Sequence, residues 1–274
     1  MLSINTNMGA MAALQSLNQT QQQLQQVQSA INSGLKVANA KDNGAVYAIA
    51  QNMRGNVAGY GAVTDSLNRG ASTVDVAINA GQSISDLLNE LKGKALAAAD
   101  GSLDTASRNA LNADFTALRD QITTIVQNAS FNGTNLVDGS TSNFQALVSV
   151  DGSKKITAQS ENLALSGAIV SLTSTGTIST LTKASTMVST INSSIQNVNA
   201  SLAKLASGSK KFSIQATFVS KLVDTLNAGI GNLVDADMAV ESAKLQSLQV
   251  KQQLGVQALS IANSAPTITL SLFR

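Results

Sequence analysis

The sequence predicts a mainly α-helical chain: an elongated, coiled-coil-like helical rod with one small β-hairpin, in which the N- and C-terminal helices are paired. Three observations predict this fold class. Four segments of the 274-residue chain carry apolar side chains at heptad spacing, which is typical of long packed helices. Pro266 is the one proline, so almost nothing in the sequence forbids long helices. A stretch near the middle alternates apolar and polar residues instead, as strands do.

The first helical segment contains no charged side chain. Residues 1–35 carry none, and Lys36 is the first. Its heptad positions are separated by alternating steps of three and four residues. Two of these positions hold glutamine, and a polar residue at such a position can fix the register of a helix pair. The ladder consists of Leu14, Leu17, Gln21, Leu24, Gln28, Ile31 and Leu35.

Three further ladders predict the long helices of the rod. The second ladder contains Gly and Ala, which would let neighbouring helices approach closely. The third begins after the break at Gly101-Ser102, where Ser102, Asp104 and Thr105 are candidate helix caps. The fourth is the longest, and only Ser209 interrupts it. The ladders are Val63, Leu67, Gly70, Val74, Ala77, Gly81, Ile84, Leu88, Leu91 and Ala95; Leu111, Phe115, Leu118, Ile122, Ile125 and Ala129; and Ala184, Val188, Ile191, Ile195, Val198, Leu202, Leu205, Ser209, Phe212, Ala216, Val219, Val223, Leu226 and Ile230.

Between the third and fourth ladders the pattern changes to period two. Asn132-Gly133 and Asp138-Gly139 are turn signals, and Asp151-Gly152 divides two alternating stretches. This arrangement predicts a β-hairpin, and the Ser/Thr-rich residues 166–182 are a candidate for further irregular strand. The alternating apolar positions are Phe144, Ala146, Val148, Val150, Ile156 and Ala158.

The last segment is apolar on more than one face, which indicates burial on more than one side. Charge is absent again between Lys251 and Arg274. Two charge-free ends fit either a helix pair inside one domain or surfaces that copies of the chain bury against each other. We favour the second, because an unpaired charge would be costly in such an interface. One stripe holds Val234, Met238, Leu245, Leu248, Leu259 and Ala262, while Val240, Val250, Leu254 and Ile261 lie off it.

Composition excludes several classes of function. The chain has no Cys and no His, so it has no disulfide, no thiolate nucleophile and no imidazole for proton transfer or metal binding. A net charge of +2 with scattered basic residues does not indicate a nucleic-acid surface. No uninterrupted apolar run is long enough to predict a membrane span. The N-terminus lacks the basic and apolar regions of an ordinary cleavable signal, so we expect none.

No motif in the sequence predicts chemistry. Asp235, Asp237 and Glu241 form an acidic cluster, but the glycine turn of a calcium loop is missing. We expect these carboxylates to cap the last helix and to favour its N-terminus. Gly-Ser-Lys-Lys at residues 208–211 is too short for a phosphate-binding loop. We therefore expect no catalytic, metal or cofactor-binding residue, and no enzyme.

Five motifs, from Ser3-Ile4-Asn5-Thr6-Asn7 at one end of the chain to Leu270-Ser271-Leu272-Phe273-Arg274 at the other, resemble those of bacterial flagellin, the subunit of the flagellar filament. Each motif alone is weak, but their order and their presence at both ends make the resemblance specific. Asn43-Gly44 departs from the family, which often has Asp-Ala there. The motifs are Ser3-Ile4-Asn5-Thr6-Asn7; Asn32-Ser33-Gly34-Leu35-Lys36-Val37 with Ala40-Lys41-Asp42; Phe131-Asn132-Gly133-Thr134-Asn135-Leu136; Asp235-Ala236-Asp237-Met238-Ala239; and the ending from Gln257-Ala258-Leu259 to Leu270-Ser271-Leu272-Phe273-Arg274.

The resemblance implies a short flagellin with little or no outer domain. Residues 1–38 and 234–274 would be the two halves of an inner assembly domain. Residues 39–130 would be the N-terminal helices of a rod domain, residues 131–182 its β-hairpin and irregular surface segment, and residues 183–233 its C-terminal long helix. The expected self-assembly residues, which pack the inner helices or join subunits, are Leu14, Leu17, Leu24, Ile31, Leu35, Met238, Leu245, Leu248, Leu254, Leu259, Ile261, Leu270, Leu272 and Phe273.

The resemblance also implies the partners and the location of the chain. It would form a helical polymer of many copies that serves swimming motility outside the cell. The flagellar type III export apparatus and a chaperone would handle it without a cleavable signal peptide, and the filament cap and hook-associated proteins would contact it. Two alternatives remain: a hook–filament junction protein with similar termini, and a membrane-active amphipathic helix protein. The charge-free first segment argues against the second alternative, which needs basic polar faces.

Overall fold

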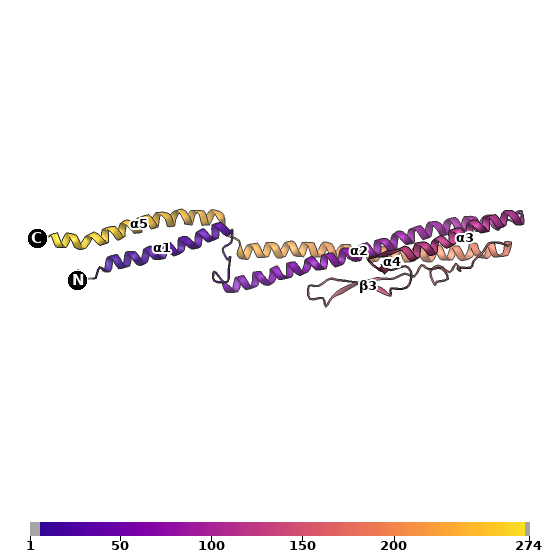
Figure 1. Cartoon of the computed structure of the whole chain (residues 1–274), viewed down its shortest axis with the longest axis horizontal. Helices are drawn as coiled ribbons and strands as arrows, with labels where there is room; N and C mark the ends of the chain where they lie inside the picture. Colours follow the sequence, from indigo (N-terminus) through magenta and orange to yellow (C-terminus); the bar gives the residue numbers. More distant parts are fainter. Residues whose placement is uncertain (1–5, 272–274) are drawn as a thin grey trace. The chain divides into compact units, whose positions relative to one another are not determined.

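The computed structural model describes residues 6–271, with side-chain environments up to residue 264. The chain divides into two compact units (Figure 1). The terminal unit comprises Met1–Gly55 and Thr225–Arg274, and the central unit comprises Asn56–Asp224. The helices are α1 (Met8–Ser33), α2 (Gly44–Ala98), α3 (Thr105–Asn128), α4 (Leu181–Val234) and α5 (Met238–Ser271). The strands are β1 (Ser130–Phe131), β2 (Thr134–Asn135), β3 (Asn143–Leu147) and β4 (Lys155–Gln159).

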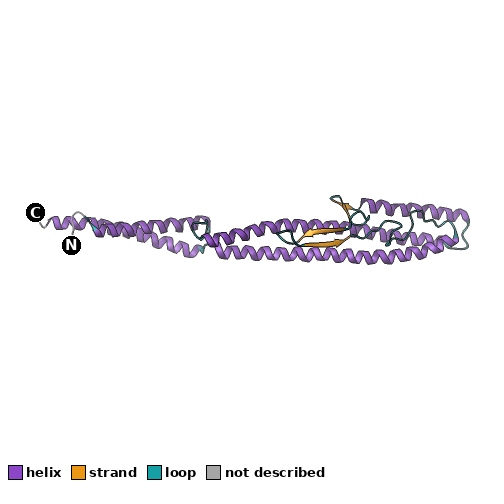
Figure 2. Cartoon of the chain, turned by 90° about the horizontal axis from the view of Figure 1, so that it is seen from below, coloured by secondary structure: helices purple, strands orange, loops and turns teal. Residues whose placement is uncertain are grey.

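The heptad ladders become the core of the central unit. Every predicted ladder position of α2, from Val63 to Ala95, is buried. Phe115 of α3 and Phe212 of α4 belong to the same apolar cluster. Figure 2 shows the three long helices of this unit running alongside one another, with the hairpin laid against them. The predicted mainly helical fold with a small β excursion is therefore confirmed.

The turn from α2 to α3 is closed by the predicted cap candidate Asp104 and by Arg108, which the sequence analysis did not single out. Asp104 is the N-cap of α3, and its carboxylate accepts a hydrogen bond from the Ser107 amide at 3.0 Å. Arg108 then donates to the carbonyls of Ala98 and Leu103 at 2.9 and 3.1 Å. These bonds satisfy backbone groups that a helix end would otherwise leave without a partner.

The predicted hairpin forms and packs on the helices. β3 and β4 pair antiparallel, with Asn143 opposite Gln159 at one end and Leu147 opposite Lys155 at the other. The Phe144 ring meets the Phe212 ring of α4 edge to face, with centroids 6.3 Å apart. Both rings pack over Gly70 of α2, where a Cβ would lie 3.0 Å from Phe144. A second, smaller pair, β1 with β2, turns at the predicted Asn132-Gly133.

Residues 166–182 differ from the expectation of further strand. They contain no regular strand, and the one bridge near their start joins Leu165 to Val170. Their backbone bonds to helix side chains instead. Arg119 of α3 donates to the Gly176 carbonyl at 2.7 Å, and Asn112 accepts from the Ile178 amide at 2.7 Å. A segment held by side chains in this way needs no strand partner.

Candidate assembly interface

The two charge-poor terminal helices pack against each other in the terminal unit. α1 and α5 lie side by side, as Figure 1 shows. Leu24 and Val27 of α1 and Leu248 of α5 are buried between them, and Ile31 and Leu245 pack against this cluster. We call these five side chains the α1–α5 seam. The predicted pairing of the terminal helices is thus present within one chain.

Polar contacts set the register of this helix pair. The Gln252 side-chain amide donates to the Gln21 side-chain oxygen at 2.9 Å. Near the chain ends, Asn7 donates to the Ala262 carbonyl at 2.6 Å. A Cβ at Gly255 would lie 3.3 Å from Leu17, so glycine lets the helices come close there. A one-turn slip between α1 and α5 would break both hydrogen bonds.

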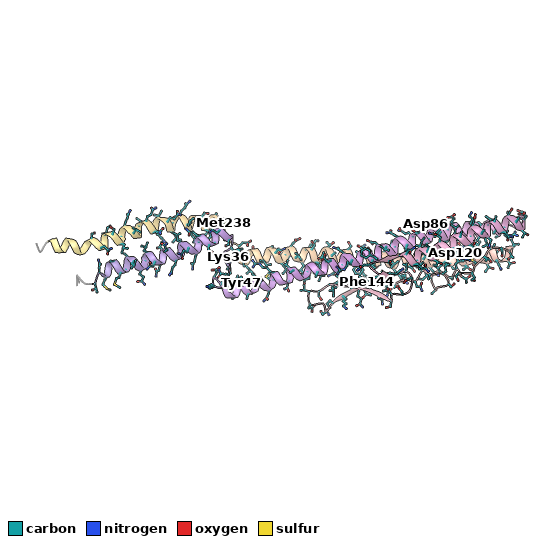
Figure 3. The ribbon with its side chains drawn as sticks, in the orientation of Figure 1. Lys36, Tyr47, Asp86, Asp120, Phe144 and Met238 are labelled. Atoms are coloured by element: carbon teal, nitrogen blue, oxygen red, sulfur yellow. The ribbon has the colours of Figure 1, made fainter. Side chains whose placement is uncertain are left out.

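Backbone contacts join the segment that follows α1 to the segment that precedes α5, and we call these contacts the clasp. Gly34 ends α1 with φ of 72°, a left-handed conformation that glycine adopts readily. Leu35 then bridges Asp235 antiparallel, and the Lys36 amide donates to the Val234 carbonyl at 2.8 Å. The Ala236 amide donates to the Gly34 carbonyl at 2.9 Å. Figure 3 shows Lys36 and Met238 near this end of the pair.

The acidic cluster takes part in this local structure. The Asp237 carboxylate accepts from the amides of Ala239 and Val240 at 3.0 and 3.2 Å, so it caps α5 as expected. Glu241 lies in the first turn and pairs with Lys244 at 2.6 Å. Asp235, by contrast, lies in the clasp and not at the helix cap.

The structure buries only some of the predicted assembly residues within one chain. Leu24 and Leu248 are buried, and Leu17, Ile31, Leu35, Leu245 and Leu259 are half-buried. Four others are exposed in the single chain: Leu14, Met238, Leu254 and Ile261. Ile261 is 70% exposed and Leu254 is 56% exposed. The side chain of Leu270 and all of Leu272 and Phe273 lie outside the described residues.

The sequence ladder also misplaced one seam position. Val27 is buried where the heptad placed the neighbouring Gln28, which is exposed. The flanking ladder residues Leu24 and Ile31 both belong to the seam, so only the position between them differs, lying three residues after Leu24 instead of four. Met8 and Met11 were not among the predicted assembly residues, yet both are exposed apolar side chains of α1.

Among the described residues, no helix combines the length and the hydropathy that a membrane crossing requires. The apolar surface of α5 is interrupted by Glu241, Lys244 and Lys251 over its first half.

Two family descriptions match the chain and together cover most of it. The bacterial flagellin N-terminal helical region matches residues 4–142, and the bacterial flagellin C-terminal helical region matches residues 179–273. Flagellin FljK of Caulobacter vibrioides is 54% identical over 272 residues, which cover 99% of this chain and 98% of that protein. The flagellin of Brucella melitensis is 34% identical over 283 residues, which cover 100% of both chains.

A solved structure gives a further likeness in fold. It belongs to a Vibrio parahaemolyticus protein assigned as flagellar hook-associated, with a TM-score of 0.58 over 71% of this chain and 100% of that chain. The two sequences are only 12% identical, so this likeness concerns the fold alone. The hook-associated alternative therefore has less support than the flagellin reading, which rests on full-length relatives. The chain belongs to the bacterial flagellin family, and it is a structural subunit of the flagellar filament and not an enzyme.

Proposed function

We propose that residues 1–38 and 234–274 form the inner assembly domain of this filament subunit. In this proposal the α1–α5 pair presents its remaining apolar side chains to other copies of the chain. The observation that carries it is the exposure of apolar side chains on two helices with little or no charge. Leu14 of α1 and Leu254 and Ile261 of α5 are all exposed, although their helices already share a buried seam.

The energetics favour burial of these side chains between copies. Removing a Leu or Ile side chain from water contributes about 1.5–3 kcal/mol when burial is complete. An unpaired charge in the same surface would cost several kcal/mol or would have to be neutralised. Residues 1–35 contain no charged side chain that could impose this cost. A polymer repeats each contact at every subunit, so selection against charge acts strongly there.

The proposal extends to residues 39–130, 131–182 and 183–233 as the parts of a rod domain. Residues 39–130 supply its N-terminal helices, residues 131–182 the hairpin and the irregular surface segment, and residues 183–233 the C-terminal long helix. The apolar core that α2, α3 and α4 share, from Val63 to Val219, supports grouping these segments in one domain.

We also infer the partners of the subunit on its way to the filament. The flagellar export apparatus and a chaperone would carry the chain out of the cell without a cleavable signal. The filament cap and the hook-associated proteins would then meet its terminal helices. The family supports these partners, because a filament subunit must be delivered and inserted at a filament end.

One substitution tests the assembly domain directly. Leu24→Asp places a carboxylate in the buried seam, so we expect loss of filaments in electron micrographs and loss of swimming. The main thermal unfolding transition of the monomer should remain, because Leu24 lies outside the central unit.

Leu24→Met is the matched control, because it keeps an apolar side chain of similar volume in the seam. It should assemble at close to the concentration that the unmodified chain needs. Normal filaments from Leu24→Asp at neutral pH would overturn the proposed role of the seam.

A further inference from the structure

The chain contains two Asn-Gly dipeptides, at residues 43–44 and 132–133. In such a pair the backbone nitrogen of the glycine can attack the carbonyl carbon of the asparagine side chain, because the glycine has no Cβ to hinder the approach. Asparagine is accordingly one of the thermolabile residues of proteins. The attack requires a side chain that is free to rotate, so local structure decides which of the two pairs reacts.

Asn132-Gly133 forms the turn between β1 and β2, and both residues are exposed. Phe131 pairs with Thr134, so the turn has two residues, and their φ angles are 49° and 78°. Tight hairpin turns with positive φ at both positions favour the sequence Asn-Gly. Within the described part of the chain, no hydrogen bond holds the Asn132 side chain or the Gly133 amide. Nothing lies within 4 Å of a Cβ at Gly133, so the turn has room to rearrange.

Asn43 is also exposed, but the start of α2 holds it in place. Its side-chain oxygen accepts a hydrogen bond from the Val46 amide at 3.1 Å. Its backbone carbonyl accepts another from the Tyr47 amide at 2.9 Å. Reaction at Asn43 would have to open this cap and unwind the first turn of the helix, so the fold protects this pair.

Asp-Gly pairs can form the same ring, but the fold restrains the three that the chain contains. Asp100 and Asp138 each accept hydrogen bonds from the amide and the hydroxyl of the serine two residues later, at 2.7–2.8 Å. Ser149 and Ser153 hold Asp151 in the same manner. A carboxylate is also a poorer electrophile than a carboxamide. Among the described residues, the side chain of Asn132 is therefore the least restrained of those followed by glycine.

We propose that Asn132-Gly133 is a site of spontaneous deamidation, which the fold selects over Asn43-Gly44. The Gly133 nitrogen forms a bond to Cγ of Asn132 and closes a succinimide ring. The side-chain nitrogen leaves as ammonia, with a proton equivalent to the one that Gly133 loses. Water then opens the ring at one carbonyl to give aspartate, or at the other to give isoaspartate. One water is consumed for each ammonia released, and the chemistry is independent of the filament function.

Isoaspartate would disturb more than the turn itself, because it adds a methylene group to the main chain of a two-residue turn. Asn135 of β2 lies two residues beyond this turn. Its side chain donates to the Val126 carbonyl at 2.7 Å and accepts from the Val137 amide at 2.8 Å. The Leu136 carbonyl accepts from the Glu161 amide at 2.9 Å. A shift of β2 would therefore strain both the end of α3 and the segment that follows β4.

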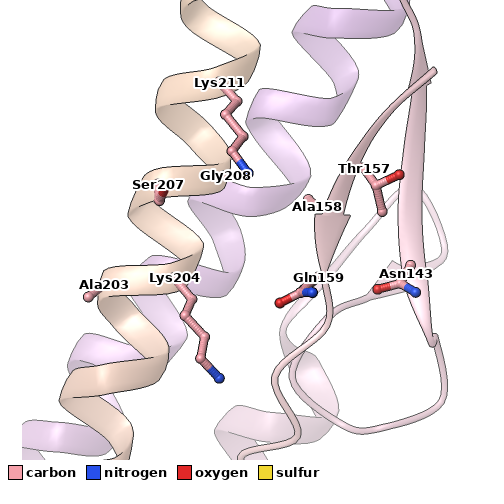
Figure 4. A pocket seen from close by; sticks show the side chains of 9 residues that line it. All are labelled: Asn143, Thr157, Ala158, Gln159, Ala203, Lys204, Ser207, Gly208 and Lys211. Atoms are coloured by element: carbon pink, nitrogen blue, oxygen red, sulfur yellow. The ribbon is translucent and has the colours of Figure 1, made fainter. Parts of the chain in front are cut away.

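Glu161 connects this region to α4. Its carboxylate accepts from the Ser201 hydroxyl at 2.9 Å and pairs with Lys204 at 3.2 Å. Figure 4 shows Lys204 beside the cleft of about 600 Å³ that lies between α4 and the β3–β4 hairpin. We expect isoaspartate at residue 132 to speed amide exchange in residues 135–137 and 160–163, and to lower the unfolding temperature of the monomer.

Incubation of the folded monomer in mildly alkaline buffer tests the proposal, because base removes the amide proton of the glycine. Peptide mass spectrometry measures the conversion of each amide to a carboxyl group, and an isoaspartyl methyltransferase assay measures isoaspartate. We expect Asn132 to react roughly tenfold faster than Asn43, because the cap of α2 must open before Asn43 can react. In denaturant, which removes the local structure, the two sites should react at similar rates.

Two substitutions assign the isoaspartate to its site. Asn132→Gly removes the reactive carboxamide and keeps a sequence that the tight turn accepts, so most of the isoaspartate should disappear. Asn43→Ser is the matched control, because serine keeps the helix cap and the isoaspartate yield should stay unchanged. Equal rates at Asn132 and Asn43 in the folded monomer, or an undiminished yield from Asn132→Gly, would overturn the proposal.

Discussion

Asp151 organises the turn that joins β3 to β4. The Ser149 hydroxyl donates a hydrogen bond to its carboxylate, and the Ser153 amide donates another at 3.2 Å. Bonds to the charged form favour that form. The hydrogen bond from the Ser149 side chain, followed by those from Ser153, lowers the pKa of Asp151 to about 2 from its ordinary value of 3.8.

This pKa predicts how the turn responds to acid. Because the folded pKa lies below the unfolded one, the stabilisation is present above pH 3.8 and is lost as the pH falls toward about 2. We expect a carboxyl titration of Asp151 near pH 2 in NMR spectra of the monomer, with faster amide exchange in residues 148–154 below that pH. Ser149→Ala should raise the midpoint toward 3.8, since it removes the largest contribution. A midpoint near 3.8 in the unmodified chain would contradict the prediction.

Single residues also show which local features could be predicted from the sequence. Asp104 was a candidate cap because Asp before an apolar ladder is a common N-cap, and it caps α3. Asn43, a departure from the family pattern, accepts from the Val46 amide at 3.1 Å at the start of α2. The clasp between Leu35 and Asp235 could not be predicted from the sequence. It joins residues 200 positions apart, and no local pattern encodes such a bridge.

At the scale of elements, the ladders were most informative where a helix packs on one side. The α2 ladder from Val63 to Ala95 is buried throughout because its Gly and Ala positions suit close contacts with its neighbours. α5 was harder, because its apolar residues occupy several faces. Met238 lies on the predicted stripe and is exposed, whereas Leu248 on the same stripe is buried. In the proposed filament, contacts with other copies would account for the apolar residues on the other faces.

Residues 166–182 illustrate a different limit of sequence reasoning. Ser and Thr richness suggested strand, but the segment is held by the side chains of Arg119 and Asn112. Those partners lie in α3, more than fifty residues away in sequence. β propensity depends on such neighbours more than on the residues themselves.

The contact between the β3–β4 turn and α2 leads to a prediction about stability. A Cβ at Gly59 would overlap the Val150 side chain, so Gly59→Ala must displace that side chain or the turn that carries it. Overpacking typically costs about 1–3 kcal/mol. Gly61→Ala is the matched control, because nothing lies within 4 Å of a Cβ there, and it should stabilise α2 by about 0.5–1 kcal/mol.

Chemical denaturation of the two variants would measure the difference. We expect Gly59→Ala to be less stable than Gly61→Ala by about 1–3 kcal/mol. Adding Val150→Ala to Gly59→Ala should recover part of that loss, because it removes the nearest methyl groups. Equal stability of the two alanine variants would mean that the turn does not rest on Gly59.

At the scale of the whole molecule, apolar burial is concentrated in one unit. Within the described residues, the cluster of the central unit draws on α2, α3, α4 and the hairpin. The α1–α5 cluster has three buried members, Leu24, Val27 and Leu248. Helical stability in proteins comes mostly from tertiary packing, so a pair with so small a cluster is marginal on its own. Its exposed apolar side chains would gain their partners only in the polymer.

This contrast predicts that ordering of the terminal helices is coupled to assembly, as in segments that fold on binding. Brief proteolysis of the monomer should trim both ends and leave a core of roughly residues 40–230 that stays helical but does not polymerise. Thermolysin suits the test, because residues 1–35 contain no Lys or Arg for trypsin to cut, whereas Lys244 and Lys251 let trypsin report on α5. The same segments should resist both enzymes in filaments, where neighbouring copies cover them. Equal resistance of α1 and α4 in the monomer would show that the α1–α5 seam is stable by itself, and assembly would then join preformed helices.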